Sequence, residues 1–412
     1  MSRKSQFFGF GRNVFFSGLV SFFMDVSSEM IYPLAPLFLA NVLGVNKSVI
    51  GLIEGVAEST ASLLKVFSGW FSDRLGRRKS LMALGYGIST LSRPVMATAV
   101  VWQQVLAARF TDRVGKGIRT APRDALIAES SRETHLGRAF SFHRAMDTMG
   151  AVLGPAIAFF LLGLSGNDYR TVFWVSMAPA VIAVLLIFVC IKERKEAIHA
   201  PSHRPKLSLG RLDWKAKFFI VISAIFALGN SSDVFLVLRA GQLGIPTVMV
   251  PVVYLVFNLV YSLSAGPAGM AADRFGRKRI ILLGFVLFAV LYYGFAVARN
   301  ATDIWFLFML YGVFMGLTDG VQKAFLASII PADFKATAFG VYATCTGVAV
   351  FPASLIGGWL WDRVSPAATF YFGASAAAVS VLLFLVLIAL MGRTGKPGLR
   401  GRAKPPVAAV TI

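Results

Sequence analysis

Apolar runs of membrane-spanning length follow one another along almost the whole chain. Of its 412 residues, 56% are hydrophobic and only 15% are charged. A bilayer core about 30 Å thick is crossed by roughly 20 apolar residues in a helix. A chain of this length therefore has room for about a dozen spans and for no large soluble domain. The sequence predicts an all-α membrane protein.

The predicted spans fall into two sets of six, separated from one another by charged or Gly/Pro-containing stretches. The first set covers residues 14–40, 48–71, 80–100, 102–128, 136–163 and 170–191. The second set covers 216–240, 248–271, 278–298, 303–328, 335–360 and 366–391. We expect two six-helix bundles at 1–191 and 216–391, a basic linker at 192–215 and a basic tail at 392–412.

The positive charge of the chain lies between the apolar runs. A net charge of +21 would suggest a nucleic-acid partner for a soluble protein. Here the segments on the N-terminal side of the membrane hold roughly 27 Lys and Arg, against about five on the other side. Cytoplasmic loops carry this excess, so we expect a multi-pass protein of the inner (plasma) membrane with both termini in the cytoplasm and with no nucleic-acid partner.

The residue types that carry most enzyme chemistry are sparse. Cys190 and Cys345 each lie within an apolar run, so neither a disulfide framework nor a cysteine metal site is indicated. No Ser/His/Asp constellation or metal-ligand cluster stands out in the sequence. We expect no enzyme activity, no cofactor and no resident metal.

One loop sequence occurs twice. The segment GWFSDRLGRRK after the second span returns as GMAADRFGRKR after the eighth. Five residues of the first copy recur 200 positions later, so that Gly69, Asp73, Arg74, Gly76 and Arg77 match Gly269, Asp273, Arg274, Gly276 and Arg277. A weaker echo links Ser27, Ser28 and Glu29 to Ser231, Ser232 and Asp233. Such repeats predict two halves related by a pseudo-twofold axis along the membrane normal.

This twin loop resembles the loop motif of the major facilitator superfamily, and the resemblance covers nearly the whole chain. It implies a twelve-helix carrier whose Asp73, Arg77, Asp273 and Arg277 latch the cytoplasmic side in the outward-open state. Carboxylates at helix ends and arginines that pair with them suit such a latch. The alternative is a basic loop that serves only to orient the chain.

Two further segments are similar to family motifs. Span 4 has Arg109, Gly115 and Gly117 in the places of the family's fourth-helix pattern, with Asp112 and Arg113 where Gln and Gly are common. The resemblance implies a role for Arg109 in proton handling.

The second motif lies in span 5, where Gly150, Gly154 and Pro155 form a GxxxGP sequence. It resembles the antiporter motif and implies export. Small residues four apart also serve ordinary helix packing, which is the competing interpretation.

Acidic residues inside the spans are the first candidates for function, because charges in a membrane are costly. Asp25 and Glu29 lie four residues apart on one face of span 1, near the middle of the membrane. Burial disfavours the charged form of a carboxylate, so such groups can carry protons. Asp233 occupies the comparable place in span 7. For Glu54, Glu58 and Asp147 we keep open the alternative of structural ion pairs with Lys65, Arg93 or Arg144.

A cationic stripe on span 4 is the second candidate. Arg109, Arg113, Lys116 and Arg123 follow one another at helical spacing, with Arg119 offset from them. Guanidinium groups pair well with carboxylate or phosphate, so the stripe favours an anionic or zwitterionic solute. Against this, Asp112, Asp124 and the acids of span 1 could neutralise these cations.

Together these features predict a monomeric secondary transporter of a small molecule. We expect proton-coupled efflux by alternating access, driven by a proton gradient. An organic-anion uptake or exchange carrier is the first alternative. A divalent-metal exporter using Asp25, Glu29 and Asp233 and a transport-dead sensor or scaffold are the others.

Overall fold

The computed structural model describes residues 6–7, 10–75, 77–131, 135–192, 213–330 and 335–394. A two-residue hairpin, β1 (Gln6–Phe7) and β2 (Phe10–Gly11), precedes the helices. The first half contains α1 (Arg12–Ile31), α2 (Ala35–Leu37), the π-helix η2 (Phe38–Val42), α3 (Lys47–Leu75), α4 (Arg78–Ala97), α5 (Trp102–Glu129), α6 (Leu136–Leu164), α7 (Tyr169–Val175) and α8 (Met177–Cys190). The second half contains α9 (Trp214–Gly229), α10 (Val234–Gln242), η5 (Thr247–Met249), α11 (Val250–Phe275), α12 (Arg277–Val297), α13 (Ala301–Ser328), α14 (Lys335–Arg363) and α15 (Pro366–Thr394).

These helices form twelve membrane spans. Within the described residues, nine stretches are long and apolar enough by composition alone to cross a membrane. The other three spans are α3, α4 and α5, with 29, 20 and 28 residues. They are long enough to cross but carry the buried Arg, Asp and Glu residues described below. The all-α, twelve-span prediction is confirmed.

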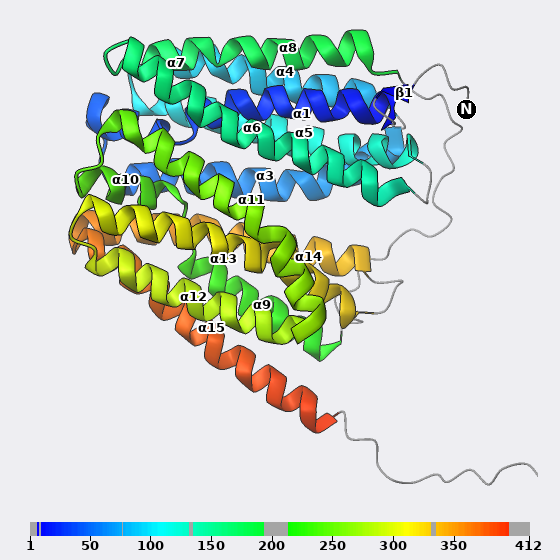
Figure 1. The fold of residues 1–412 in the computed structure, drawn as a ribbon, viewed down its shortest axis with the longest axis vertical. Coiled ribbons are helices and arrows are strands. Elements are labelled where there is room, and N and C mark those ends of the chain that lie inside the picture. Colours follow the sequence, from blue (N-terminus) through cyan, green and yellow to red (C-terminus); the bar gives the residue numbers. More distant parts are fainter. Residues whose placement is uncertain are drawn as a thin grey trace, which may run out of the picture.

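The spans run side by side in two bundles (Figure 1). Helices α1 to α8 form one bundle and α9 to α15 the other, as the repeat predicts. We call the end of the molecule at which α1 begins the base, and the opposite end, where α1 is followed by α2 and η2, the tip. The predicted linker at 192–215 and tail at 392–412 lie largely outside the described residues.

Span 7 is broken in the middle. Helix α9 ends at Gly229 and α10 begins at Val234, so Asn230 to Asp233 are not helical. The span predicted at 216–240 is present as Trp214–Gln242, but it consists of two helices. The equivalent residues of span 1, Ser27 to Glu29, remain within α1. The two halves therefore differ in backbone conformation at this sequence echo.

The two halves meet closely at the tip. Helix α3 packs along α14, and Ser59 Oγ donates a hydrogen bond of 2.8 Å to the Gly347 carbonyl. The Asp362 carboxylate, at the end of α14, accepts from the backbone N–H groups of Lys47 and Ser48 at 3.1 and 2.7 Å and from Ser48 Oγ at 2.6 Å. An acid of one half thus caps the first helical turn of a helix in the other half.

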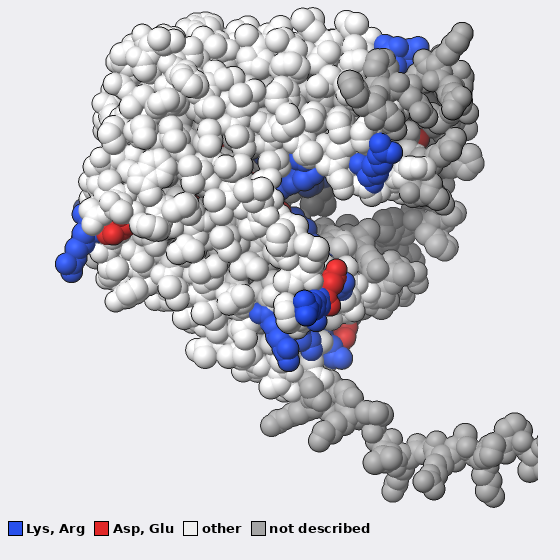
Figure 2. All heavy atoms as spheres, viewed as in Figure 1, with Lys and Arg blue, Asp and Glu red and all other residues white. Residues whose placement is uncertain are grey.

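Toward the base the halves separate. Figure 2 shows a hollow between them, with Lys and Arg side chains at its edge. A cavity of about 250 Å³ lies between α9, α13, α14 and Ser62 of α3. A second one, of about 490 Å³, lies between α11, α13 and Arg144 of α6. The molecule is closed at the tip and hollowed toward the base.

Candidate functional site

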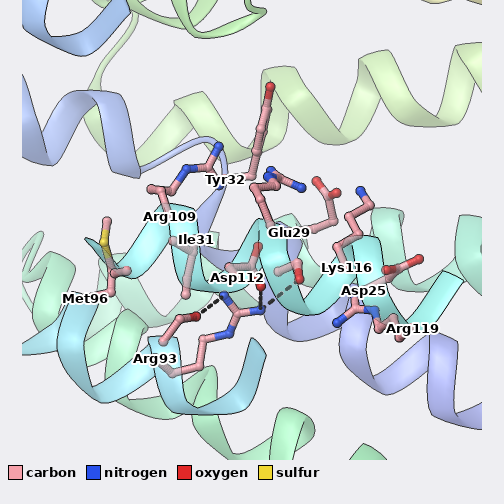
Figure 3. Close-up of a pocket in the computed structure, with 14 residues that line it drawn as sticks. Asp25, Glu29, Ile31, Tyr32, Arg93, Met96, Arg109, Asp112, Lys116 and Arg119 are labelled. Carbon is pink, nitrogen blue, oxygen red and sulfur yellow. Dashed lines mark hydrogen bonds and ion pairs between the residues drawn. The ribbon is translucent and has the colours of Figure 1, made fainter. Parts of the chain in front are cut away.

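A small cavity in the N-terminal half brings the predicted residues together. Its volume is about 30 Å³, enough for one or two water molecules. Six of the seven predicted cavity residues line it, namely Asp25, Glu29, Arg109, Asp112, Arg113 and Lys116. Figure 3 shows Asp25, Lys116 and Arg119 together at one end of this cavity and Arg109 at the other. Arg119, which the sequence placed off the cationic stripe, lines the cavity as well.

Two arginines of the stripe are held by acids of α3. Arg109 binds Glu54 in a bidentate pair, with Nε to Oε1 at 2.9 Å and a nitrogen to Oε2 at 2.5 Å, and both side chains are buried. One turn further, Arg113 lies 3.1 Å from Glu58. The sequence named Lys65, Arg93 or Arg144 as partners of these acids, and for Glu54 and Glu58 the structure contradicts that assignment.

Other charges in this half are also paired. Arg93 of α4 lies 3.3 Å from Asp112 and donates to Ser27 Oγ and Ser28 Oγ of α1, at 3.0 and 2.9 Å. Because this network ties α1, α4 and α5 together, it gives Asp112 a partner and fixes the helices that carry the cavity.

Two further cations of α5, Arg119 and Arg123, and the acid Asp147 also have neighbouring partners. Arg119 donates to Ser89 Oγ at 2.8 Å and lies over the ring of Tyr86. Arg123 pairs with Asp124. Asp147 lies 3.4 Å from Nδ1 of His143, four residues away on the same helix, and this neighbour was not among the partners that the sequence named.

Asp25, Glu29 and Lys116 differ from these paired residues. Among the described residues, none of the three has a hydrogen-bond or ion-pair partner within 4 Å, and Oε2 of Glu29 is fully buried. All three face the same cavity. A carboxylate pair without bound cations, beside one lysine, can exchange protons more readily than acids that are held in ion pairs.

The glycines of the span 5 motif pack directly behind this acid pair. A Cβ atom at Gly150 would lie 2.9 Å from Cβ of Asp25, and one at Gly154 would lie 2.8 Å from Cβ of Glu29. Both distances are shorter than real Cβ contacts. The motif therefore provides close packing of α6 on α1, and it does so at the two acids.

The seventh predicted residue, Asp233, lies in the other half. It stands at the N-cap of α10, beside the break in span 7, and accepts a hydrogen bond of 2.6 Å from the Tyr311 hydroxyl. The small N-terminal cavity does not include it among its lining residues. The structure thus separates Asp233 from the acid pair of span 1.

The described residues of the loop motifs form no hydrogen bond or ion pair between the halves. Arg277 lies 3.7 Å from Asp273 of its own loop and donates to the Ala324 carbonyl of α13. Gly276 has φ +94°, a left-handed conformation that suits glycine, and separates α11 from α12. Arg274 is in the last turn of α11, near Gly269, and Arg77 precedes α4. Gly76 and the side chains at Gly69, Asp73 and Arg74 lie outside the described part.

Sequence reasoning missed a polar contact between the halves. Arg144 of α6 donates to the Tyr261 hydroxyl of α11 at 2.6 Å, and this hydroxyl donates to Asp319 of α13 at 3.0 Å. Lys323 pairs with the other oxygen of Asp319 at 2.7 Å. The signal available in the sequence was the i,i+4 spacing of Asp319 and Lys323 inside an apolar span.

The aromatic contact that closes the cavity toward the tip was also missed. The rings of Tyr32 and Tyr254, one from each half, have centroids 5.4 Å apart. Arg109 lies over the Tyr32 ring at 5.3 Å. Among the described residues, no group of three or more His, Cys, Asp and Glu side chains could hold a metal ion.

Comparison with known proteins identifies the family. The family model described as Major Facilitator Superfamily matches residues 17–261 and 218–410. An uncharacterized MFS-type transporter of Methanocaldococcus jannaschii is 35% identical over 386 residues, which cover 91% of this chain and 95% of that protein. The quinolone resistance protein NorA of Staphylococcus aureus is 22% identical, with 89% of this chain and 94% of that protein covered.

Solved structures agree on the fold. The crystal structure of the nucleoside transporter NupG has a TM-score of 0.74 at 13% sequence identity and covers 92% of this chain and 99% of its own. A POT family transporter solved with 5-aminolevulinic acid has a TM-score of 0.77 at 11% identity, covering 95% and 98%. With two bundles, a repeated loop and a family match over residues 17–410, the protein belongs to the major facilitator superfamily of membrane transporters.

Proposed function

We propose that the protein is a proton-coupled exporter that exchanges a small solute for protons across the plasma membrane. The observation that carries this proposal is the unpaired acid pair Asp25 and Glu29, in a half whose other buried acids have partners. A carrier that couples to protons needs a carboxylate that gains and loses a proton during its cycle. Carboxylates already bound by Arg93, Arg109 or Arg113 suit this task less well.

The direction of access follows from the charge of the loops. The excess of Lys and Arg on the base side supports a cytoplasmic base, with both termini inside. In that orientation the described conformation is closed to the outside by Asp362 and by the Tyr32–Tyr254 contact, and it is open toward the cytoplasm. Separation of the halves at the base fits the loop motif of the second half, where Arg277 pairs within its own loop.

We expect proton movement to be coupled to the conformational change through Asp25 and Glu29 on α1. In the outward-open state, protons reach Asp25 and Glu29 from outside, and their neutralisation removes the attraction to Lys116 and Arg119 across the shared cavity. This change favours the conformation closed at the tip, in which the protons leave to the cytoplasm. The cargo moves the other way: it binds in the conformation open to the cytoplasm and leaves from the outward-open state. The tight packing on Gly150 and Gly154 keeps both acids attached to α6 throughout.

The export direction is supported by similarity to NorA, which is named for quinolone resistance. The organic-anion alternative loses support from the stripe, because Arg93, Arg109, Arg113 and Arg123 all have carboxylate partners, which leaves Lys116 and Arg119 as the described cavity cations without one. An anionic cargo would have to displace these partners. That alternative predicts that Arg113→Ala abolishes binding of an anion such as benzoate.

The test is proton movement in proteoliposomes. Pyranine trapped inside the proteoliposomes reports the internal pH when norfloxacin or uridine is added. These two solutes are chosen because a relative is named for quinolone resistance and a structural neighbour for nucleoside transport. We expect Asp25→Asn to abolish proton movement while solute exchange without a gradient continues. Asp303→Asn, a half-buried acid in the first turn of α13, is the matched control and should behave as wild type. An unchanged proton response in Asp25→Asn would refute the proposal.

A further inference from the structure

We propose that the cargo binds in the C-terminal half, beside the break in span 7, and that it is an uncharged solute with an aromatic ring and hydrogen-bonding groups. This inference rests on the proposed transport function and adds the place and the chemical class of the cargo. It assigns different tasks to the two halves, with protons handled by α1 and cargo held by α9, α13 and α14.

The volumes of the cavities at Asp25 and at Asn230 favour this division. The cavity at Asp25 and Glu29 holds about 30 Å³, which is room for one or two waters. The cavity at Asn230 holds about 250 Å³, close to the lower bound of roughly 300 Å³ for small-molecule pockets. In the described conformation a ring-sized solute fits the second cavity and not the first.

The cavity of about 250 Å³ is lined by aromatic, small apolar and mostly uncharged polar side chains. Phe226 of α9 and Phe314 of α13 line it, with ring centroids 6.1 Å apart. Asp319 is the single charged residue among its lining residues, and it is neutralised by Lys323 at 2.7 Å. A charged cargo entering here would find no free counter-charge on the described walls and would lose its hydration. An uncharged cargo avoids that cost.

Two side-chain amides offer donors to this cavity. The Gln322 side-chain oxygen accepts from the Tyr342 hydroxyl at 2.8 Å, which leaves the amide nitrogen without a partner among the described residues. Asn230 repeats this arrangement, because its side-chain oxygen accepts from the Tyr292 hydroxyl at 3.4 Å. Each tyrosine therefore fixes the amide so that its NH₂ group remains for a ligand. Carbonyl or hydroxyl oxygens on a neutral solute would accept these bonds.

The break in span 7 places one of the amides at the centre of the molecule. Asn230 is the first residue after α9 and lies beside the non-helical segment that ends at Asp233. Interrupted helices form the substrate sites of many secondary transporters, because their unwound backbone lines a cavity. Here the sequence echo in span 1 stays helical and carries the acids instead. Span 1 is interrupted later along its length, at Tyr32 to Leu34, beyond its acid pair, so only in span 7 does the break fall at the echoed residues.

The experiment measures binding to the purified full-length protein in detergent, at one pH and without a gradient, so that coupling plays no part. The probes are uridine, which is neutral and has a ring with carbonyl groups, norfloxacin, which carries a carboxylate and an amine, and benzoate. We expect uridine to bind at least tenfold more tightly than the other two. Gln322→Leu and Asn230→Ala should each weaken uridine binding roughly tenfold, by loss of a hydrogen bond in a desolvated site. Gln103→Leu, on the exposed start of α5, is the control.

The outcomes separate this inference from the proposed function. Tighter binding of benzoate or norfloxacin than of uridine would refute the proposal that the cargo is uncharged. Absence of uridine binding to the folded wild type would refute it as well. Uridine binding that persists in both cavity variants but is lost in Arg113→Ala overturns the location. Failure of the pyranine test with normal uridine binding removes proton coupling and leaves the cargo site in place.

Discussion

Removal of one partner from the buried pair of Glu54 and Arg109 should destabilise the protein strongly. The side chains of this pair are 2% and 7% exposed, and they form two hydrogen bonds. Glu54→Gln removes one charge and leaves Arg109 buried without its counter-ion. Breaking a buried pair in this way costs about 3–5 kcal/mol.

This cost converts into a melting-temperature shift. Unfolding entropy of roughly 2.1 cal/mol/K per residue gives about 0.9 kcal/mol/K for 412 residues. Glu54→Gln should therefore lower the Tm of the detergent-purified protein by about 3–6 °C. The assay is thermal unfolding followed by intrinsic tryptophan fluorescence, because the chain has 7 tryptophans.

The matched control is Glu58→Gln, the same substitution one turn away on α3. Glu58 is 33% exposed, so solvent already screens its pair with Arg113, and the expected shift is about 1 °C or less. The double variant Glu54→Leu with Arg109→Met should recover most of the loss, because it removes both charges together. Equal shifts for Glu54→Gln and Glu58→Gln, or a double variant less stable than Glu54→Gln, would refute the reasoning.

Two further predictions concern packing and the tip. Gly154→Ala forces a Cβ atom against Glu29 and should lower Tm by about 1–3 °C, with the same conversion, whereas Gly163→Ala, which meets nothing within 4 Å, should leave Tm unchanged. An unchanged Tm in Gly154→Ala would contradict the close contact between α6 and α1. Asp362→Ala removes three hydrogen bonds across the tip and should speed hydrogen exchange in the first turn of α3 and in α10, while Asp303→Ala, whose carboxylate accepts only from its own loop, should not. Equal exchange in both variants would show that Asp362 does not hold the tip closed.

Much of the fold could be predicted because it depends on local signals. Apolar runs define spans through the cost of placing polar backbone in lipid, and the loop repeat at an offset of 200 residues defines two related halves. The position of Asp25 and Glu29 on a common face also followed from helical periodicity alone. These features need no knowledge of which helices become neighbours.

The ion-pair partners could not be assigned in this way, because they depend on how helices pack. Glu54 and Glu58 were matched to the wrong cations, although the sequence contained a usable signal. The two acids are four residues apart on α3, and Arg109 and Arg113 are four apart on α5. Both pairs have the same separation along the chain, since α3 and α5 run in parallel and in register. Matching spacing of opposite charges on two spans predicts such a ladder.

The break in span 7 has a weaker signal in the amino-acid sequence. The segment Asn230 to Asp233 contains two serines, an asparagine and an aspartate, which favour caps and turns over helix interiors. The similar run at Ser27 to Glu29 is helical, because Arg93 binds both serine hydroxyls and α6 packs against the backbone there. Tertiary contacts decide between the two outcomes, and they are not encoded in the local sequence.

The contact of Asp362 with backbone amides affects which substitutions the tip tolerates. Two of its three hydrogen bonds reach main-chain N–H groups, which every residue except proline supplies. The side chain at position 47 can therefore vary in size and charge without loss of the closed tip. Substitutions there other than proline should be nearly neutral for transport. Closure built in this way also depends little on ionic strength compared with a Lys–Asp pair, so the transporter should keep its outer seal in dilute and in saline surroundings alike.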